Sequence, residues 1–218
     1  MMKAEVGDKT FALWLLGDSN PKNWADRLDF PLDPRHSARH SIWTPILDMI
    51  QQEAFLARHT RIDVSNLYVR NAIQNADHKP KDNVLEWKDE RELNAAITQD
   101  IANLHTLAEQ YKPKIIFTFG AFSFEFARRA VEGTNDPYVY GYWSTRLLGQ
   151  EFRRRIENFD PQKVNVVPLL HATIARGRFL ESHRDFCAGE DPNYFVFTGT
   201  KLGQLLVKHY EAFSFWMQ

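Results

Sequence analysis

Four short apolar segments recur along the chain, and each has the composition of a buried β-strand. They are Phe11–Leu16, Leu67–Ile73, Lys114–Phe119 and Val164–Leu170. Each is rich in β-branched or aromatic residues and is shorter than a typical helix. Continuous apolar runs of this length predict parallel strands that are buried on both faces.

Apolar residues at helical spacing fill the intervals between these segments. Ser41 can cap a helix that reaches Ala57, and a longer helical pattern covers roughly Glu90–Tyr111. Another pattern starts at Gly120, and the last covers Leu202–Phe213. Strands that alternate with helices imply right-handed βαβ crossovers. The predicted fold class is therefore α/β, a three-layer α/β/α sandwich with a central four-stranded parallel sheet.

One part of the chain departs from this alternation. Residues 132–160 look like an insertion, in which the aromatic loop "GTNDPYVYGYW" precedes an amphipathic stretch that Ser144 can cap. We expect the aromatic residues to pack the insertion onto the body, although they also offer rings for base stacking. The arginine triplet 153–155 is expected to form a solvated helix face. No linker is visible, so residues 1–218 are predicted to form a single domain.

Composition narrows the possible partners. The net charge is −1, whereas proteins that bind phosphates non-specifically are usually more basic. Cys187 is the only cysteine, which excludes a disulfide within the chain and an iron–sulfur cluster held by cysteines. A single cysteine fits a reducing cytoplasm. The apolar run near the N-terminus is too short for a signal peptide or a membrane span, so no membrane partner is expected.

Polar residues gather where the first predicted strand ends, in "LLGDSNP". The carboxyl ends of parallel strands form the binding edge of such a fold. Two chemistries fit this turn. Gly-Asp-Ser is typical of a serine esterase with Ser19 as nucleophile, and Asn20 followed by proline is typical of a loop that holds water. An esterase also needs a histidine base oriented by a carboxylate, but the one Asp-x-x-His runs from Asp33 to His36, close behind Ser19.

The four strand ends combine into a more specific pattern. They read "LLGDSNP", "LYVRNAIQ", "PKIIFTFGAFSFEFA" and "VNVVPLLHATIARG". In order and spacing they resemble the uracil-DNA glycosylase superfamily over about residues 11–185, with the insertion set aside. "GDSNPKNW…DFPLDPRHSARHSIWTPILDMI" looks most like the mismatch-specific branch. "VRNAIQNADHKPKDN…DIANLHTLAEQYKPKIIFTFG" looks more like the thermostable bacterial branches.

The resemblance implies a monofunctional DNA glycosylase without a cofactor, which flips uracil or a modified pyrimidine out of DNA and excises it. Asn20 then positions the attacking water, and its role is orientation because an amide is not basic. Asn71 reads the base edge with its donor and acceptor, and His171 donates to a base carbonyl as charge develops there. Asp18 is the only carboxylate in the turn, and its direction stays open.

The resemblance also implies contacts to the DNA. The family's stacking aromatic falls on Phe30 or on Leu32. After His171 the family's usual Pro-Ser is replaced by Ala-Thr, so Thr173 keeps a hydroxyl for a phosphate and Ile174 takes the place of the apolar wedge. Four arginines are placed in the sequence for phosphate contacts: Arg35, Arg39, Arg176 and Arg178.

The basic stretch 35–40 has a second interpretation. Asp29 and Asp33 lie beside it and can cancel its charge, which would make it an ordinary solvated surface. His36 and His40 have the spacing of metal ligands on a helix, but no third ligand presents itself, so no metal is predicted.

Two other functions stay open at this point. The same fold can bind a nucleotide or nucleic acid without cutting it, and the Ser19 esterase is the third candidate.

Overall fold

The computed structural model describes most of the chain, with the side chains of residues 90–96 left aside. The described residues are 3–19, 28–36, 39–74, 90–133, 142–171, 180–191 and 193–217. Among the described helices, none is both long and apolar enough to cross a membrane.

A five-stranded sheet forms the centre of the molecule, in the order β1-β3-β2-β4-β5. The strands are β1 (Glu5–Val6), β2 (Leu13–Ser19), β3 (Tyr68–Ile73), β4 (Ile115–Phe119) and β5 (Asn165–Leu169). β3, β2, β4 and β5 run parallel, which confirms the four predicted strands. β1 is an addition that pairs antiparallel with β3. A strand of two residues is too short to show periodicity, so the sequence pattern did not reveal it.

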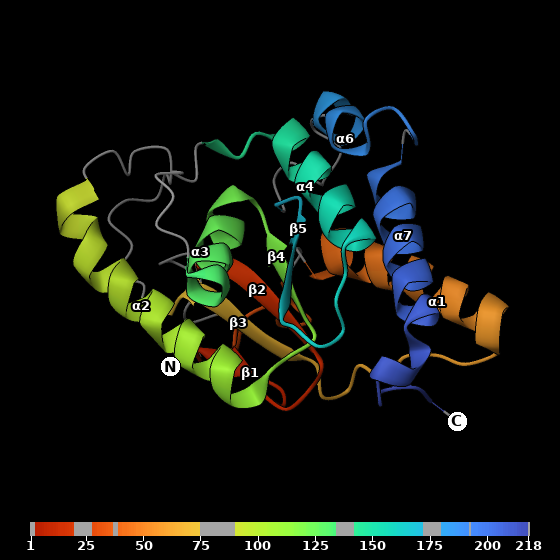
Figure 1. The fold of residues 1–218 in the computed structure, drawn as a ribbon, viewed down its shortest axis with the longest axis horizontal. Helices are drawn as coiled ribbons and strands as arrows, with labels where there is room; N and C mark the ends of the chain where they lie inside the picture. The colour runs from red at the N-terminus through yellow and green to blue at the C-terminus, as the bar shows by residue number, and fades with distance from the viewer. Residues whose placement is uncertain are drawn as a thin grey trace.

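Helices cover both faces of this sheet and complete the three-layer α/β/α sandwich (Figure 1). They are η2 (Arg39–Trp43), α1 (Thr44–Arg58), α2 (Glu90–Tyr111), α3 (Ala121–Glu132), α4 (Thr145–Glu157), α6 (Leu180–Cys187), α7 (Tyr194–Lys208) and η6 (Tyr210–Ala212). α2 and α3 pack on one face, and α4 packs on β5. On the other face Trp43 of η2 meets Phe117 of β4, with ring centroids 5.9 Å apart.

Helix ends differ from the predictions in two places. Ser41 does not cap α1, since residues 39–43 form a π-helical turn and α1 begins at Thr44. Pro45 follows, and proline suits a first helical turn because its missing N–H would have no partner there. The last predicted helix, Leu202–Phe213, is in fact the C-terminal part of α7 followed by η6. α6 was not predicted at all.

Close contact between α1 and α7 depends on two glycines one turn apart. A methyl group on Gly199 would lie 2.6 Å from the Ile46 carbonyl oxygen, and one on Gly203 would lie 3.2 Å from the Ile50 Cα. The two helix backbones therefore approach more closely than any larger side chain allows. This packing fixes the N-terminus of α7 relative to the sheet.

The described part of the predicted insertion packs onto the body of the protein. Ser144 caps α4 as expected, since its hydroxyl accepts the Leu147 N–H. Trp143 donates its indole N–H to the buried Glu125 carboxylate of α3 at 2.7 Å. The same carboxylate accepts two hydrogen bonds from Arg128, at 2.9 and 3.0 Å. A buried carboxylate needs such partners, so this cluster ties the Trp143 segment to α3.

Candidate functional site

The structure describes seven of the twelve candidate site residues. Asp18, Asn71, His171, Phe30, Leu32, Arg35 and Arg39 are described. The others lie outside the described residues: Asn20, Thr173, Ile174, Arg176 and Arg178.

Asn71 lies near the carboxyl end of β3, and its side chain packs against the backbone of β2. The strand register places it directly opposite Gly17. Its side chain is almost fully buried, with 7% of the residue exposed. A methyl group on Gly17 would lie 2.3 Å from Asn71 Oδ1, which is far inside van der Waals contact. Glycine at position 17 is thus what allows the Asn71 amide to occupy this place.

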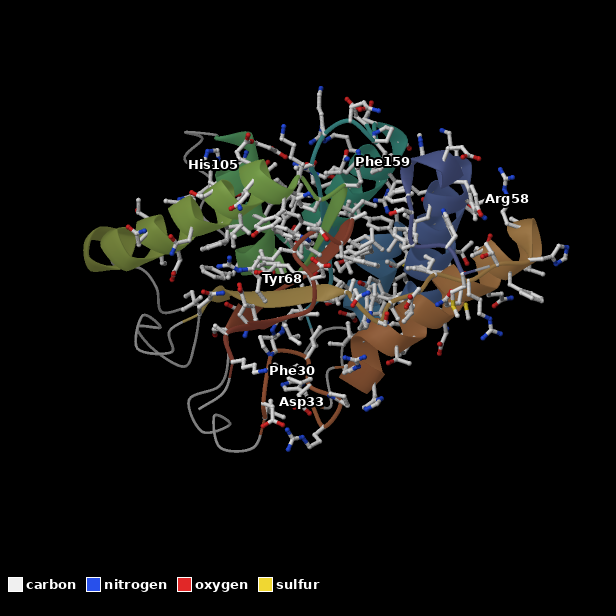
Figure 2. The ribbon with its side chains drawn as sticks, turned by 90° about the horizontal axis from the view of Figure 1, so that it is seen from below. Phe30, Asp33, Arg58, Tyr68, His105 and Phe159 are labelled. Carbon is white, nitrogen blue, oxygen red and sulfur yellow. The ribbon has the colours of Figure 1, made fainter. Side chains whose placement is uncertain are left out.

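The register also shows which face of the sheet these residues share. Side chains alternate along a strand, so Gly17, Ser19 and Asn71 belong to the face that carries Phe117, the face covered by Trp43. Figure 2 shows Phe30 and Asp33 on the opposite side of the molecule from His105 of α2, so their loop also lies on the side of the sheet away from α2.

Asp18 belongs to the other face. It shares that face with Leu16, two residues earlier on the same strand, and with Arg70, the residue of β3 that pairs with Leu16. The strand therefore carries the Asp18 carboxylate away from the face of Asn71. The direction that the sequence left open is resolved, and it does not bring Asp18 together with the Asn71 amide.

His171 lies just beyond β5 and packs against Gly120, the residue between β4 and α3. A methyl group on Gly120 would lie 2.9 Å from the His171 Cβ. Gly120 has a φ of +94°, a backbone conformation that favours glycine. Its N–H donates to the Leu169 carbonyl at 2.8 Å and so links the turn after β4 to the end of β5.

Asn71 and His171 therefore lie at the same edge of the sheet, on the two outer parallel strands. β2 and β4 separate them, which corresponds to about 14 Å between strand axes at the usual spacing. The Asn71 backbone is paired with β2, whereas His171 follows the end of β5. The ends of β2 and β4 therefore lie between the Asn71 and His171 positions.

The loop 28–36 is organised around the buried Asp33 carboxylate. Arg35 donates to it from Nε at 2.9 Å and from Nη2 at 2.7 Å, and its backbone N–H donates as well, at 2.8 Å. The Arg35 guanidinium also pairs with Asp29 at 2.7 Å. These hydrogen bonds hold the pKa of Asp33 well below its usual range. Arg35 thus has two carboxylate partners inside the loop, which matches the interpretation in which acidic residues cancel its charge.

Arg39 and the two stacking candidates are also placed by this loop. Arg39 donates from Nη1 to the Leu32 carbonyl at 3.2 Å. Leu32 has a φ of +52° and packs against the hydrophobic core. Phe30 and Leu32 are both half-buried, so exposure does not choose between the two candidates. Phe30 is the one that carries an aromatic ring.

Ser19 lacks the surroundings of a nucleophile. Its hydroxyl oxygen is buried and has no hydrogen-bond partner among the described residues. The Asp33 carboxylate of the Asp-x-x-His pair accepts from Arg35 instead of orienting a histidine. An esterase needs a base within hydrogen-bond reach of the serine, and the described residues do not supply one.

The arginine triplet of α4 forms a solvated face only in part, since the Arg154 side chain is 60% exposed while Arg153 and Arg155 are partly buried. Arg153 donates to the Phe186 carbonyl at 2.6 Å, and Arg155 pairs with Glu132 at 2.6 Å. Arg154 pairs with Glu151. Within the part of the chain that the structure describes, no three His, Cys, Asp or Glu side chains gather as metal ligands.

Three residues of this region were missed by sequence reasoning. Gly17 and Gly120 were visible as glycines at strand ends, but their contacts to Asn71 and His171 follow only from the strand order. Tyr194 of α7 accepts the Leu170 N–H through its hydroxyl oxygen, at 2.8 Å. No local sequence signal marks a hydrogen bond between segments so far apart.

Comparison with known proteins gives no assignment. A scan against protein-family models finds no match, and neither does a search of curated proteins. The function is therefore argued from the residues and their geometry.

Proposed function

We propose that the protein is a DNA N-glycosylase that excises uracil or a modified pyrimidine, with DNA as its partner and the cytoplasm as its location. One observation carries the proposal: Asn71 and His171 are held at the same edge of the sheet, each against a glycine. The order of the motifs along the chain, which resembles the uracil-DNA glycosylase superfamily, supports it further.

The reaction requires few groups from the protein. The oxygen of a water molecule bonds to the sugar C1′, the N-glycosidic bond breaks, and the base leaves as an anion that later takes up a proton. Asn20 orients that water. Asn71 offers both a donor and an acceptor to the edge of the flipped base. His171, as a neutral imidazole, donates to the carbonyl oxygen on which charge develops.

The proposal predicts abasic sites in DNA that carries the right base. Single-stranded and mismatched oligonucleotides with uracil or modified pyrimidines are incubated with the protein, and alkali reveals abasic sites as strand breaks. Asn20→Ala is expected to lower the excision rate by about 10²-fold or more, as expected when a reacting group loses its orientation. Asn71→Ala is expected to lower excision as well, because an amide contact to the base is lost.

Ser19→Ala is the matched control in the same turn and is expected to keep full excision. Binding of these oligonucleotides without abasic sites would instead indicate a non-catalytic member of this fold. Hydrolysis of a simple ester that depends on Ser19 would overturn the glycosylase proposal in favour of the esterase.

A further inference from the structure

The chain segment that carries His171 is held by a residue from a distant part of the sequence. Leu170 lies between β5 and His171, and its N–H donates to the Tyr194 hydroxyl oxygen at 2.8 Å. Both residues are fully buried. A buried backbone N–H without a partner is costly, so this hydrogen bond fixes where the backbone runs after β5.

The Tyr194 ring is itself firmly held. It packs against Phe186, His183 and Phe195, with ring centroids 5.0–5.5 Å apart. Asn193 caps α7 by accepting the N–H groups of Phe195 and Val196, so the first turn of the helix is well defined. Burial raises the pKa of the Tyr194 hydroxyl, which therefore stays protonated.

A second hydrogen bond holds the same segment. The Gly120 N–H donates to the Leu169 carbonyl at 2.8 Å, and Gly120 also forms the surface on which the His171 Cβ lies. Two consecutive residues, 169 and 170, are thus fixed by hydrogen bonds with Gly120, the residue after β4, and with Tyr194 of α7. The next residue in the chain is His171.

We infer that Tyr194 is a positioning residue for His171, acting through the Leu170 backbone. The inference rests on the proposed function, in which His171 donates to the departing base. Removal of the Tyr194 hydroxyl frees the Leu170 N–H and lets the backbone before His171 shift. The reaction rate falls steeply when a catalytic group is displaced, by up to roughly 10²-fold for a displacement of 1 Å.

Tyr194→Phe removes the hydroxyl and keeps the ring. On the substrate that the wild-type protein cuts, kcat is expected to fall about tenfold with little change in KM, because the imidazole acts in the transition state. The imidazole NMR signals of His171 are expected to shift in the same variant. Tyr68→Phe is the control, since it removes another buried hydroxyl, one that donates to Glu5 of β1. Both readouts should keep wild-type values in this variant.

Asn193→Ala provides a second variant that leaves the tyrosine in place. It removes the cap of α7 and is expected to lower kcat by a smaller factor than Tyr194→Phe. Wild-type kcat and unchanged His171 signals in Tyr194→Phe would overturn the inference. A wild-type protein that cuts no DNA, combined with shifted His171 signals in Tyr194→Phe, would refute the proposed function and leave the positioning role standing.

Discussion

The two outer parallel strands, β3 and β5, each lead to a polar side chain that packs on a glycine next to it. Asn71 lies on Gly17 of β2, and His171 lies on Gly120 after β4. The contacts differ in where they touch the side chain. A methyl group on Gly17 would meet the tip of Asn71, its Oδ1, whereas one on Gly120 would meet the His171 Cβ, next to the backbone.

Gly17 and Gly120 therefore have different roles. Asn71 belongs to a paired strand, so the register fixes its backbone and Gly17 affects only where the amide lies. His171 follows the end of its strand, and its backbone depends on Gly120 and on the Leu170–Tyr194 hydrogen bond. Changes at the first glycine should therefore act on function, and changes at the second should act on stability first.

Gly120→Ala is expected to have the largest effect on stability. Its φ of +94° with a ψ of 174° is a region that only glycine occupies readily, and the strain for other residues is about 1–3 kcal/mol. Crowding of the His171 Cβ adds about 1–3 kcal/mol. We expect urea denaturation to show a free energy of unfolding lower by about 2–6 kcal/mol, the sum of the two.

The control lies at the other end of the same helix. Gly133 ends α3 with a φ of +62°, and a methyl group there would meet none of the described residues within 4 Å. Gly133→Ala therefore adds backbone strain alone, which costs about 1 kcal/mol. Equal losses in the two variants would show that the contact with His171 carries no weight.

Gly17→Ala is expected to have a smaller effect on stability and a large one on excision. The new methyl group displaces the Asn71 amide at a cost of about 1–2 kcal/mol. When a group that hydrogen-bonds the base is displaced by an ångström or more, the excision rate falls by about 10²-fold. Excision assays and urea denaturation on the same preparation check both expectations.

A double variant sharpens this test. Asn71→Ala removes the Oδ1 atom that the new methyl group would strike. Adding Gly17→Ala to Asn71→Ala should therefore cost little or no stability, in contrast to its effect on the wild-type protein. Full excision by Gly17→Ala would contradict the role assigned to Asn71.

The same two glycines show how far the sequence alone reaches. The four parallel strands were predicted because continuous apolar runs are a local signal, and α2 was predicted over the same residues that the structure shows. The positions of Asn71 and His171 at strand ends followed from these strands. Their partners, Gly17 and Gly120, depend on which strands are neighbours, and the order β3-β2-β4-β5 is not encoded in any one segment.

Other features of the structure were not predicted from the sequence, for related reasons. Alternation along a strand fixes which residues share a face, but it does not say which face meets which helix, so the direction of Asp18 needed the register with β3. Arg35 was placed among the phosphate contacts, while the structure pairs it with Asp29 and Asp33. Nearby charges of opposite sign compete for an arginine, and the sequence does not rank those partners.

Ser19→Ala is expected to have the smallest effect, and it tests what governs the end of β2. Ser19 lies on the same face as Gly17 and Asn71, yet its buried hydroxyl oxygen has no hydrogen-bond partner among the described residues. A desolvated hydroxyl without a partner destabilises a fold, so its removal should leave the free energy of unfolding unchanged or raise it by up to about 1 kcal/mol. Urea denaturation measures this. A loss of more than about 1 kcal/mol would mean that the hydroxyl does have a partner. If Ser19→Ala is neutral while Gly17→Ala abolishes excision, this face of β2 acts through the space it leaves for Asn71 rather than through hydrogen bonds of its own.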